Sequence, residues 1–338
     1  MDNSADSNKK QAIRVSNLTK EFNGFKAIDN ISFSVEEGEI FGMLGPNGAG
    51  KTTTIRILST TLKATKGEAF VWGYDISKQP DKIRRSIGIV FQDQTLDDRL
   101  TGMENLDFHA RLYGMKRNLR EKRIKEVLHL VDLWDKRNTL VKYYSGGMCR
   151  RLEIARGLMH YPRVLFLDEP TLGLDAQTRH NIWEHIRVLN KREKIAILLT
   201  THYMDEADTL CNRVGIIDKG KILIIDEPEK LKNMVGKDLI SIKVSSPEKM
   251  MQILSNFEWV SNKRVYDGLL HLEVTEGEKR IPFLINLAQR YSLSVDLVSL
   301  RRPTLEDVFL HFTGKRIREE EGTLRERISA RIRSRRRR

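Results

Sequence analysis

Eight consecutive residues have the order of a loop that binds phosphate groups. Gly45–Thr52 reads Gly-Pro-Asn-Gly-Ala-Gly-Lys-Thr and matches the pattern G-x-x-x-x-G-K-[ST]. Glycines let successive backbone N–H groups point at phosphate oxygens, and a helix that begins at Lys51 adds positive potential there. Lys51 supplies a charge for the β- and γ-phosphates, and the Thr52 hydroxyl is a ligand for Mg²⁺. The pattern therefore favours a nucleoside triphosphate site over a glycine turn that only begins a helix.

Two adjacent acidic residues follow a fully apolar segment. Val164–Leu167 is a continuous apolar run, which is typical of a strand buried on both faces of a parallel sheet, and Asp168 and Glu169 come directly after it. Adjacent acids at a turn are usually solvated surface, but the buried strand and the upstream phosphate loop favour a functional role. We expect Asp168 to hold Mg²⁺ through water and Glu169 to polarise the attacking water.

Short apolar segments alternate with helical patterns along the first two thirds of the chain. Strands are predicted at Ile13–Val15, Ile31–Val35, Ile40–Leu44, Gly67–Gly73, Ile87–Phe91, Val164–Leu167 and Ile195–Leu199. Helices are predicted from Lys51, across Glu104–Trp134 and around Ile182–Leu189. This alternation indicates an α/β fold with right-handed crossovers between parallel strands.

The pattern changes after Pro228. Leu239–Val244, Phe257–Tyr266 and Leu269–Val274 are predicted strands, and Pro247–Leu254 and Ile281–Arg290 are predicted helices. We therefore expect a polar, disordered tail at 1–10, a large domain at 11–228, a small α+β domain at 229–312 and a basic tail at 313–338.

Composition excludes several classes of protein. The chain has 338 residues and a net charge of +13, of which the 24 residues from Lys315 to Arg338 carry +7. At 40% hydrophobic and 31% charged residues, wholesale disorder is not expected. No apolar run approaches the roughly 20 residues of a membrane span. The polar N-terminus lacks the apolar stretch of a signal peptide, and Cys149 and Cys211 have no metal-binding spacing. These features predict a cytosolic chain.

A third motif connects these segments to a known family. Ser145-Gly146-Gly147 lies 23 residues before Asp168, and by itself it predicts a helix start capped by Ser145. Together with the phosphate loop and the acidic pair, it resembles the signature Leu-Ser-Gly-Gly-Gln of the ATP-binding subunits of ABC transporters. Tyr144 replaces the leucine and Met148 replaces the glutamine.

Other elements of that family follow in order. Gln92 matches the glutamine loop, which senses Mg²⁺ and connects to membrane subunits, and Asp175 matches the D-loop aspartate. His202 matches the switch histidine that contacts the γ-phosphate. Phe22 lies 29 residues before Lys51, where the family stacks an aromatic ring on adenine, and Phe25 is the competing candidate.

The resemblance implies an ABC-type P-loop NTPase domain with a helical subdomain at about 93–160. The residues that the motif and the resemblance assign to ATP are Phe22, Gly45, Pro46, Asn47, Gly48, Ala49, Gly50, Lys51, Thr52, Thr53, Gln92, Ser145, Gly146, Gly147 and Asp175. Those assigned to Mg²⁺ are Thr52, Gln92 and Asp168, and those assigned to catalysis are Lys51, Glu169 and His202.

Two segments point to a subfamily. Thr101–Leu106 is similar to the Thr-x-x-Glu-Asn-Leu stretch of ABC-2-class ATPases. Arg301–Leu310 contains Pro-Thr-Leu-Glu-Asp-Val-Phe, which resembles the C-terminal helix of daunorubicin-resistance-type ATPases. Structurally, this stretch predicts Thr304 as the cap of an amphipathic helix whose inward-facing residues are Leu305, Val308, Phe309 and Phe312.

The resemblance also implies an assembly. One signature and one phosphate loop per chain require a head-to-tail homodimer, in which Ser145 and Gly147 of one protomer face the nucleotide of the other. Relatives in this group export drugs and other hydrophobic or amphipathic molecules through separate ABC-2-type permease subunits. The chain is therefore expected at the cytoplasmic face of the cell membrane.

The basic tail has three open interpretations. Leu324, Ile328 and Ile332 recur every four residues among arginines, which would give a helix a narrow apolar stripe for an anionic membrane. Nucleic-acid binding and a merely solvated tail are the alternatives.

Two other functions compete with export. A soluble ABC-type ATPase would act on nucleic acid or ribosomes through the arginine tail, but such relatives usually carry two ATPase modules or a long coiled-coil insertion. A regulatory nucleotide binder without catalysis is disfavoured by the intact set Lys51, Asp168, Glu169 and His202.

The membrane interpretation of the tail predicts that a peptide of residues 315–338 floats with anionic vesicles and not with neutral ones. Electrostatic attraction to anionic lipids and the apolar stripe would act together. Flotation with neither kind of vesicle would contradict it.

Overall fold

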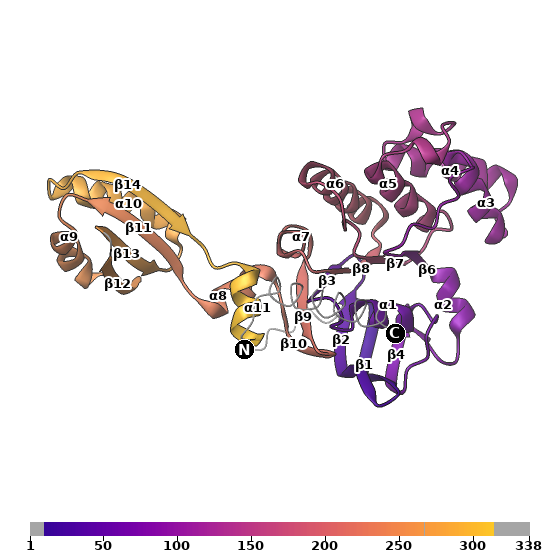
Figure 1. The fold of residues 1–338 in the computed structure, drawn as a ribbon, viewed down its shortest axis with the longest axis horizontal. Helices are drawn as coiled ribbons and strands as arrows, with labels where there is room; N and C mark the ends of the chain where they lie inside the picture. Colours follow the sequence, from indigo (N-terminus) through magenta and orange to yellow (C-terminus); the bar gives the residue numbers. More distant parts are fainter. Residues whose placement is uncertain (1–9, 267, 314–338) are drawn as a thin grey trace, which may run out of the picture. The chain divides into compact units, whose positions relative to one another are not determined.

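A computed structural model describes residues 10–266 and 268–313 (Figure 1). The expected tails at 1–10 and 313–338 therefore lie almost entirely outside the described residues. The chain divides into two compact units, one that ends at Pro228 and one formed by Glu229–Gly314. Within the described ranges, no helix is both long and apolar enough to cross a bilayer.

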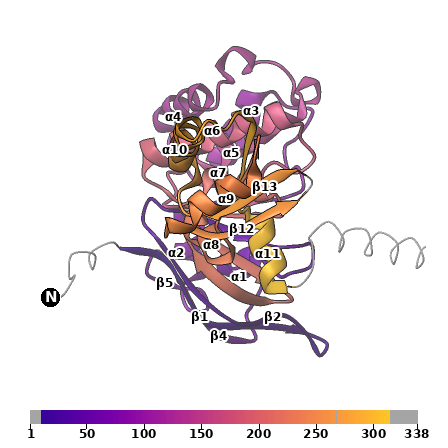
Figure 2. The same ribbon diagram turned by 90° about the vertical axis from the view of Figure 1, so that its left-hand side faces the viewer.

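The first unit contains two sheets. The larger has the order β10-β9-β3-β8-β7-β6 and the smaller has the order β2-β1-β4-β5. The strands of the larger sheet are β3 (Ile40–Leu44), β6 (Ile87–Val90), β7 (Val164–Asp168), β8 (Ala196–Thr201), β9 (Arg213–Asp218) and β10 (Lys221–Asp226). Those of the smaller sheet are β1 (Gln11–Phe22), β2 (Phe25–Glu36), β4 (Lys66–Val71) and β5 (Tyr74–Asp75), and Figure 2 shows β1, β2 and β4 side by side.

The larger sheet is parallel except at β10, which pairs antiparallel with β9. Every residue of β3, β7 and β8 is buried, which explains why these strands are apolar up to the polar residues at the ends of β7 and β8. Because β3, β8 and β7 are adjacent and parallel, their carboxyl ends meet at one edge of the sheet.

Helices cover both faces of this sheet (Figure 1). On one side lie α1 (Lys51–Leu58) and α2 (Pro80–Ser86), and on the other lie α5 (Gly146–Gly157), α6 (Ala176–Glu193) and α7 (Met204–Leu210). Apolar side chains of β1, α1 and the β3–β8–β7 strands share one core that includes Ile13, Ile55, Met43, Leu198 and Phe166. The helix expected to begin at Lys51 does begin there.

The helical pattern predicted across Glu104–Trp134 corresponds to two helices. α3 (Gly102–Leu112) and α4 (Arg117–Leu130) are separated by a turn in which Gly114 has φ +67°, and short 3-10 turns follow at Trp134–Lys136 and Val141–Tyr143. A capping box formed by Thr101 and Glu104 fixes the start of α3.

The second unit is a small α+β fold. Its strands β11 (Asp238–Val244), β12 (Val260–Tyr266), β13 (Leu269–Val274) and β14 (Val295–Arg301) form an antiparallel sheet in the order β12-β13-β11-β14. Between them run α9 (Pro247–Ile253), a 3-10 turn at Leu254–Asn256 and α10 (Gly277–Arg290), with α8 (Pro228–Val235) before and α11 (Leu305–Thr313) after. The chain order from β11 to β14 is the split β-α-β-β-α-β pattern.

Two expectations for this unit need correction. The strand predicted at Phe257–Tyr266 begins only at Val260, since Leu254–Asn256 is a 3-10 turn. Thr304 does cap α11, because its hydroxyl accepts a hydrogen bond from the Asp307 N–H at 3.2 Å. Leu305, Val308 and Phe309 are buried as expected, but the prediction for Phe312 is wrong: its side chain, in the last turn of the helix, is 39% exposed.

The core of the second unit predicts that alanine substitution at two leucines lowers the free energy of unfolding by different amounts. Leu272 is fully buried in the core between the sheet and its helices, whereas Leu297 is 49% exposed. Leu272→Ala should lower the free energy of unfolding of this unit by about 2–5 kcal/mol, because it leaves a cavity. Leu297→Ala should cost less than about 1 kcal/mol.

Denaturant unfolding followed by tryptophan fluorescence measures both changes in a background where Trp72, Trp134 and Trp183 are replaced by phenylalanine, which leaves Trp259 in this unit as the reporter. Equal losses from the two substitutions would contradict the assigned core.

Candidate active site

The phosphate loop lies between β3 and α1. Gly48 and Gly50 have φ values of +84° and +108°, which side-chain-bearing residues rarely adopt. A Cβ on Gly45 would lie 2.1 Å from the Ile217 carbonyl oxygen. Backbone conformation and close packing therefore both require glycine in this loop.

The other residues predicted for the loop differ in exposure. Asn47 and Gly48 are exposed, Ala49 and Gly50 are buried, and Pro46 is buried beside Gly45. Thr52 and Thr53, in the first turn of α1, are half-buried.

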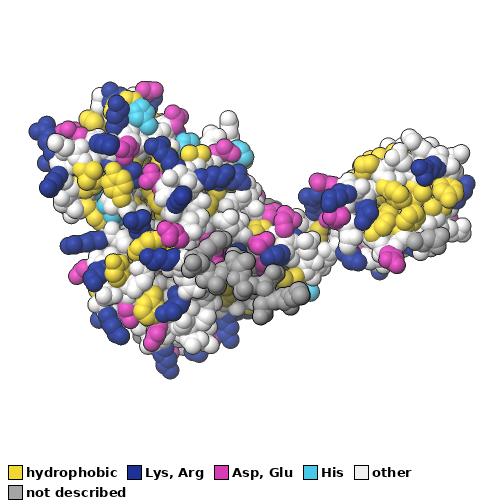
Figure 3. Space-filling model, turned by 180° about the vertical axis from the view of Figure 1, so that it is seen from behind, with side chains coloured by type: hydrophobic (Ala, Val, Ile, Leu, Met, Phe, Trp, Pro, Cys, Tyr) yellow, Lys and Arg dark blue, Asp and Glu magenta, His cyan; other side chains and the backbone are white. Residues whose placement is uncertain are grey.

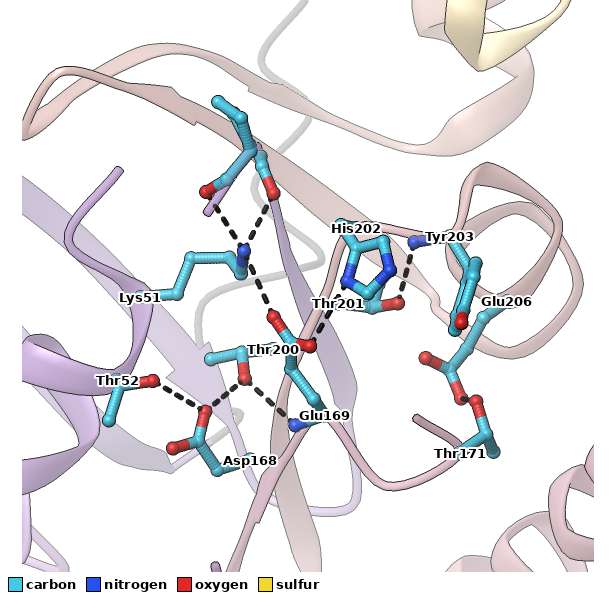
Figure 4. Close-up of polar contacts among 12 residues, drawn as sticks. Lys51, Thr52, Asp168, Glu169, Thr171, Thr200, Thr201, His202, Tyr203 and Glu206 are labelled. Atoms are coloured by element: carbon cyan, nitrogen blue, oxygen red, sulfur yellow. Dashed lines mark hydrogen bonds and ion pairs between the residues drawn. The ribbon is translucent and has the colours of Figure 1, made fainter. Parts of the chain in front are cut away.

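The Lys51 ammonium lies inside the loop. Its side chain is 4% exposed and donates to the carbonyl oxygens of Gly45 at 2.7 Å and Pro46 at 3.0 Å. It also lies 3.2 Å from Glu169 Oε1 (Figure 4). Lys51 thus joins the loop after β3 to the acid after β7.

Asp168 is held by two hydroxyl groups. The Oδ1 atom of this buried carboxylate accepts hydrogen bonds from Thr52 Oγ1 at 3.1 Å and Thr200 Oγ1 at 2.6 Å. Thr200 comes from β8, the strand next to β7, and Thr52 comes from α1 (Figure 4). The Thr52 hydroxyl and the Asp168 carboxylate therefore converge as two hard oxygen ligands.

Glu169 lies between Lys51 and His202. Its two carboxylate oxygens contact Lys51 Nζ and His202 Nδ1, the latter at 3.0 Å. Its backbone has φ +46°, and its N–H donates to the Thr200 carbonyl and hydroxyl oxygens, both at 3.1 Å. A non-glycine residue held in this region is a local strain that neighbouring contacts must fix.

Burial raises the pKa of the Glu169 carboxyl, but the hydrogen bond to His202 and the charge of Lys51 outweigh burial. The net effect lowers the pKa below its ordinary value of 4.5. The fold therefore holds this carboxylate ionised beside a lysine and a histidine.

The signature residues lie at the start of α5. Ser145 caps this helix, as predicted, by accepting a hydrogen bond from the Met148 N–H. A Cβ on Gly147 would lie 2.4 Å from a methyl carbon of Thr178, so glycine is needed for the close approach of α5 and α6. Asp175 caps α6 through the Thr178 N–H at 2.9 Å. These hydrogen bonds are local, and they leave Ser145 and Gly146 exposed.

The other three predicted residues are exposed. Gln92 is exposed in the loop after β6. Phe22 and Phe25 pair with each other where β1 and β2 meet, and their side chains are 44% and 66% exposed. Lys20 Nζ lies 4.7 Å from the ring centre of Phe22.

Sequence reasoning missed several residues around the acids. Thr200 binds both Asp168 and Glu169, and Arg150 on α5 donates to the carbonyl oxygens of both. Glu206 on α7 accepts hydrogen bonds from Thr171 and Trp183, and burial raises the pKa of its carboxyl. Only the position of Thr200, two residues before the predicted His202, could have pointed to a role.

Comparison with known proteins identifies relatives over nearly the whole chain. Residues 28–172 match the family described as ABC transporter. The chain is 38% identical over 314 residues to the daunorubicin resistance ATP-binding protein DrrA2 of Streptomyces coeruleorubidus, covering 92% of this chain and 97% of that protein. It is 35% identical to the linearmycin resistance ATP-binding protein LnrL of Bacillus subtilis (strain 168), covering 91% and 100%.

Solved structures show the same fold. An ADP-bound conformation of the ATP-binding cassette MJ1267 superposes with a TM-score of 0.59 and 28% identity, covering 65% of this chain and 92% of that one. A dimeric post-hydrolysis state of the cassette MJ0796 with ADP and Pi superposes with a TM-score of 0.57 and 27% identity, covering 64% of this chain and 98% of that one.

The lowered pKa of Glu169 predicts a pH-dependent contribution to stability. Ionised Glu169 stabilises the folded chain above its ordinary pKa of 4.5, and this contribution is lost as the pH falls through the lower pKa of the folded state. The difference in unfolding free energy between wild type and E169Q should therefore become less favourable to wild type as the pH falls from neutral to below 4.5. Denaturant titrations across this range measure it.

E37Q, at an exposed position, controls for the loss of one carboxylate. A wild-type advantage over E169Q that stays constant or grows as the pH falls would contradict the prediction.

Proposed function

The chain belongs to the ATP-binding proteins of the ABC transporters, and on that premise we propose that it powers export of a drug-like, hydrophobic or amphipathic molecule. Its family membership makes it an ATPase of a transporter that works as a dimer with membrane permease subunits. Relatives named for resistance to daunorubicin, doxorubicin and linearmycin, and one named for Nod factor export, support this cargo class.

One contact carries the assignment of the reacting groups: the Glu169 carboxylate between Lys51 and His202. We assign Lys51 and the loop amides to the β- and γ-phosphates, where they oppose the charge of the transferred group. Glu169, held as a carboxylate, acts as the base by accepting a hydrogen bond from the attacking water, which orients and polarises that water. His202 stabilises charge on the γ-phosphate.

The approach of ATP rearranges the contacts of Lys51. The ammonium is held by two carbonyl oxygens and one carboxylate, and a triphosphate offers it stronger anionic partners. As Lys51 turns to phosphate, Glu169 keeps its hydrogen bond to His202. Binding the nucleotide would thus release the acid that activates water.

Mg²⁺ fits the ligands at the end of β7. Thr52 Oγ1 and Asp168 Oδ1 converge within 3.1 Å, and a hydroxyl with one carboxylate is a donor set that Mg²⁺ accepts when phosphates and water complete it. We assign Thr52 and Asp168 to this ion, with Gln92 as a further candidate. The bound ion would neutralise charge on the β- and γ-phosphates.

The signature residues complete the site of a second protomer. Ser145 and Gly146 are exposed, at the N-terminus of a 12-residue helix that begins at Gly146, where backbone N–H groups favour an anion. Asp175, exposed at the start of α6, would link the two sites of a homodimer. Either Phe22 or Phe25, both exposed, would stack on adenine.

Family membership also supports a proposal for the cellular location of the chain and for its membrane partner. We propose ABC-2-type permease subunits as the membrane partner, a position at the cytoplasmic face of the membrane, and contact of the basic tail with anionic lipid. On the face drawn in Figure 3, Lys and Arg side chains are scattered among acidic and apolar ones, which does not favour a nucleic-acid surface there. The unit at 229–314 is proposed as an accessory domain.

The roles assigned to Glu169 predict a specific defect in E169Q. Glutamine keeps the size of the side chain but lacks the negative charge and the basicity of the carboxylate. The kcat for ATP hydrolysis should therefore fall by about a hundredfold or more. ATP binding should persist, and ATP should drive the variant into a stable dimer detectable by size-exclusion chromatography.

E184Q, an exposed position on α6, serves as the matched control and should turn over ATP like wild type. Unchanged turnover in E169Q would overturn the assignment of the base.

A further inference from the structure

Arg150, on the helix that carries the signature motif, is a buried cation. Its side chain is 8% exposed, and all five N–H donors of its guanidinium are used. Nε donates to the Pro170 carbonyl at 2.7 Å. Nη1 donates to the Phe91 carbonyl at 2.6 Å and to Glu153 at 2.9 Å, and Nη2 donates to the carbonyls of Asp168 and Glu169 at 2.9 and 3.1 Å.

The four carbonyl groups belong to the two segments that leave β6 and β7. Phe91 directly precedes Gln92, and Asp168-Glu169-Pro170 carries both acids of the site. Backbone carbonyls at strand ends have lost their ladder partners and need other donors when buried. One planar guanidinium supplies these donors for both segments, so they are fixed to each other through α5.

The same face of α5 holds the far side of the loop after β6. Glu153 accepts hydrogen bonds from Thr95 N–H at 2.9 Å and from its hydroxyl at 3.4 Å. Arg156 donates to the Thr95 carbonyl at 3.0 Å and to its hydroxyl. Residues 150, 153 and 156 are spaced three apart, so they share one helix face. Their side chains bind the loop of Gln92 through Phe91 and Thr95.

A purely structural role is the simpler alternative, because loss of a buried charge partner is destabilising wherever it occurs. It does not explain the choice of carbonyls. The guanidinium binds the backbone of Glu169 itself, whose φ of +46° needs outside support, and it does so from the helix that begins at the signature.

We propose that Arg150 is a positioning residue that fixes the backbone of Glu169 and the loop of Gln92 to the signature helix. This inference rests on the proposed function, in which Glu169 orients water and Ser145 faces the partner's nucleotide. The hydrogen bonds of Arg150 would transmit contact between the signature and that nucleotide to the loop of Gln92 and to the backbone of Glu169. Each protomer's own acid is thereby set by contact with the nucleotide of the other.

The inference predicts a defect in turnover that is separate from nucleotide binding. Lysine at position 150 keeps the charge but cannot span four carbonyls, so Glu169 loses its support. None of the five hydrogen bonds of Arg150 goes to the phosphate loop, which therefore keeps its own contacts with ATP. In the full-length chain, R150K should lower the kcat about tenfold or more, because small misplacement of a reacting group is costly. The Kd for ATP, titrated without Mg²⁺, should stay within about threefold of wild type.

Arg151 provides a matched control on the same helix. It also donates to two carbonyl oxygens, those of Val131 and Asp132 at 3.0 and 3.2 Å, but these lie at the end of α4 and away from the acids. R151K should leave the kcat within about twofold of wild type. R150K turnover within that same range, or a parallel loss of turnover and ATP affinity, would overturn the inference.

E153Q keeps the inference testable if R150K does not fold. It removes the charge that pairs with Arg150 while keeping the size of the side chain, so it should lower the kcat in the same direction without changing the Kd for ATP. Because the two side chains act as one unit, the R150K/E153Q double variant should lose less than the product of the single losses. Multiplicative losses, or wild-type turnover in E153Q, would count against the inference.

Failure of the proposed function would look different. It would appear as no ATP turnover in wild type and R151K alike, and it would remove both proposals. Failure of the inference alone leaves wild-type turnover intact and R150K active.

Discussion

The site depends on one constraint, the parallel alignment of β3, β8 and β7 as neighbours. Their carboxyl ends lie at one edge of a fully buried sheet, so residues that are far apart in sequence must meet there. The phosphate loop follows β3, Asp168 ends β7 with Glu169 directly after it, and His202 follows β8. The contact of Glu169 with Lys51 and His202 is the direct result. Any change that shifts one of these strands would separate the Glu169 carboxylate from Lys51 and His202.

Two neighbouring side chains, Thr200 and Arg150, bind polar groups of Asp168 and Glu169 at the end of β7. Thr200 uses its hydroxyl and carbonyl to hold Asp168 and the Glu169 N–H, and Arg150 satisfies the carbonyls on the other side. Glu169 can therefore occupy a conformation that side-chain-bearing residues rarely adopt. The hydrogen bonds of Thr200 and Arg150 therefore tie the backbone of Glu169 to α5 as well as to the sheet.

Short-range patterns made most of this site predictable. The phosphate loop and the acidic pair depend on local order, so Lys51, Asp168 and Glu169 could be found from spacing alone, and alternating apolar segments indicated the α/β fold. Arg150 could not be found in this way, because an arginine in a helix normally predicts a solvated face and its acceptors are backbone carbonyls up to 59 residues away. Phe312 was assigned inward by helical periodicity alone, which does not show that the last turn of α11 leaves it exposed. The two phenylalanines of the β1–β2 hairpin stay undistinguished because they occupy paired, exposed positions.

The central claim is that this chain supplies ATP hydrolysis to a separate membrane permease. The most direct measurement is purification of the tagged chain from its native membranes, with mass spectrometry of the proteins that accompany it. The account predicts a stoichiometric polytopic membrane protein that stays bound after nuclease treatment. Ribosomal proteins or nucleic acid, with no membrane partner, would contradict it.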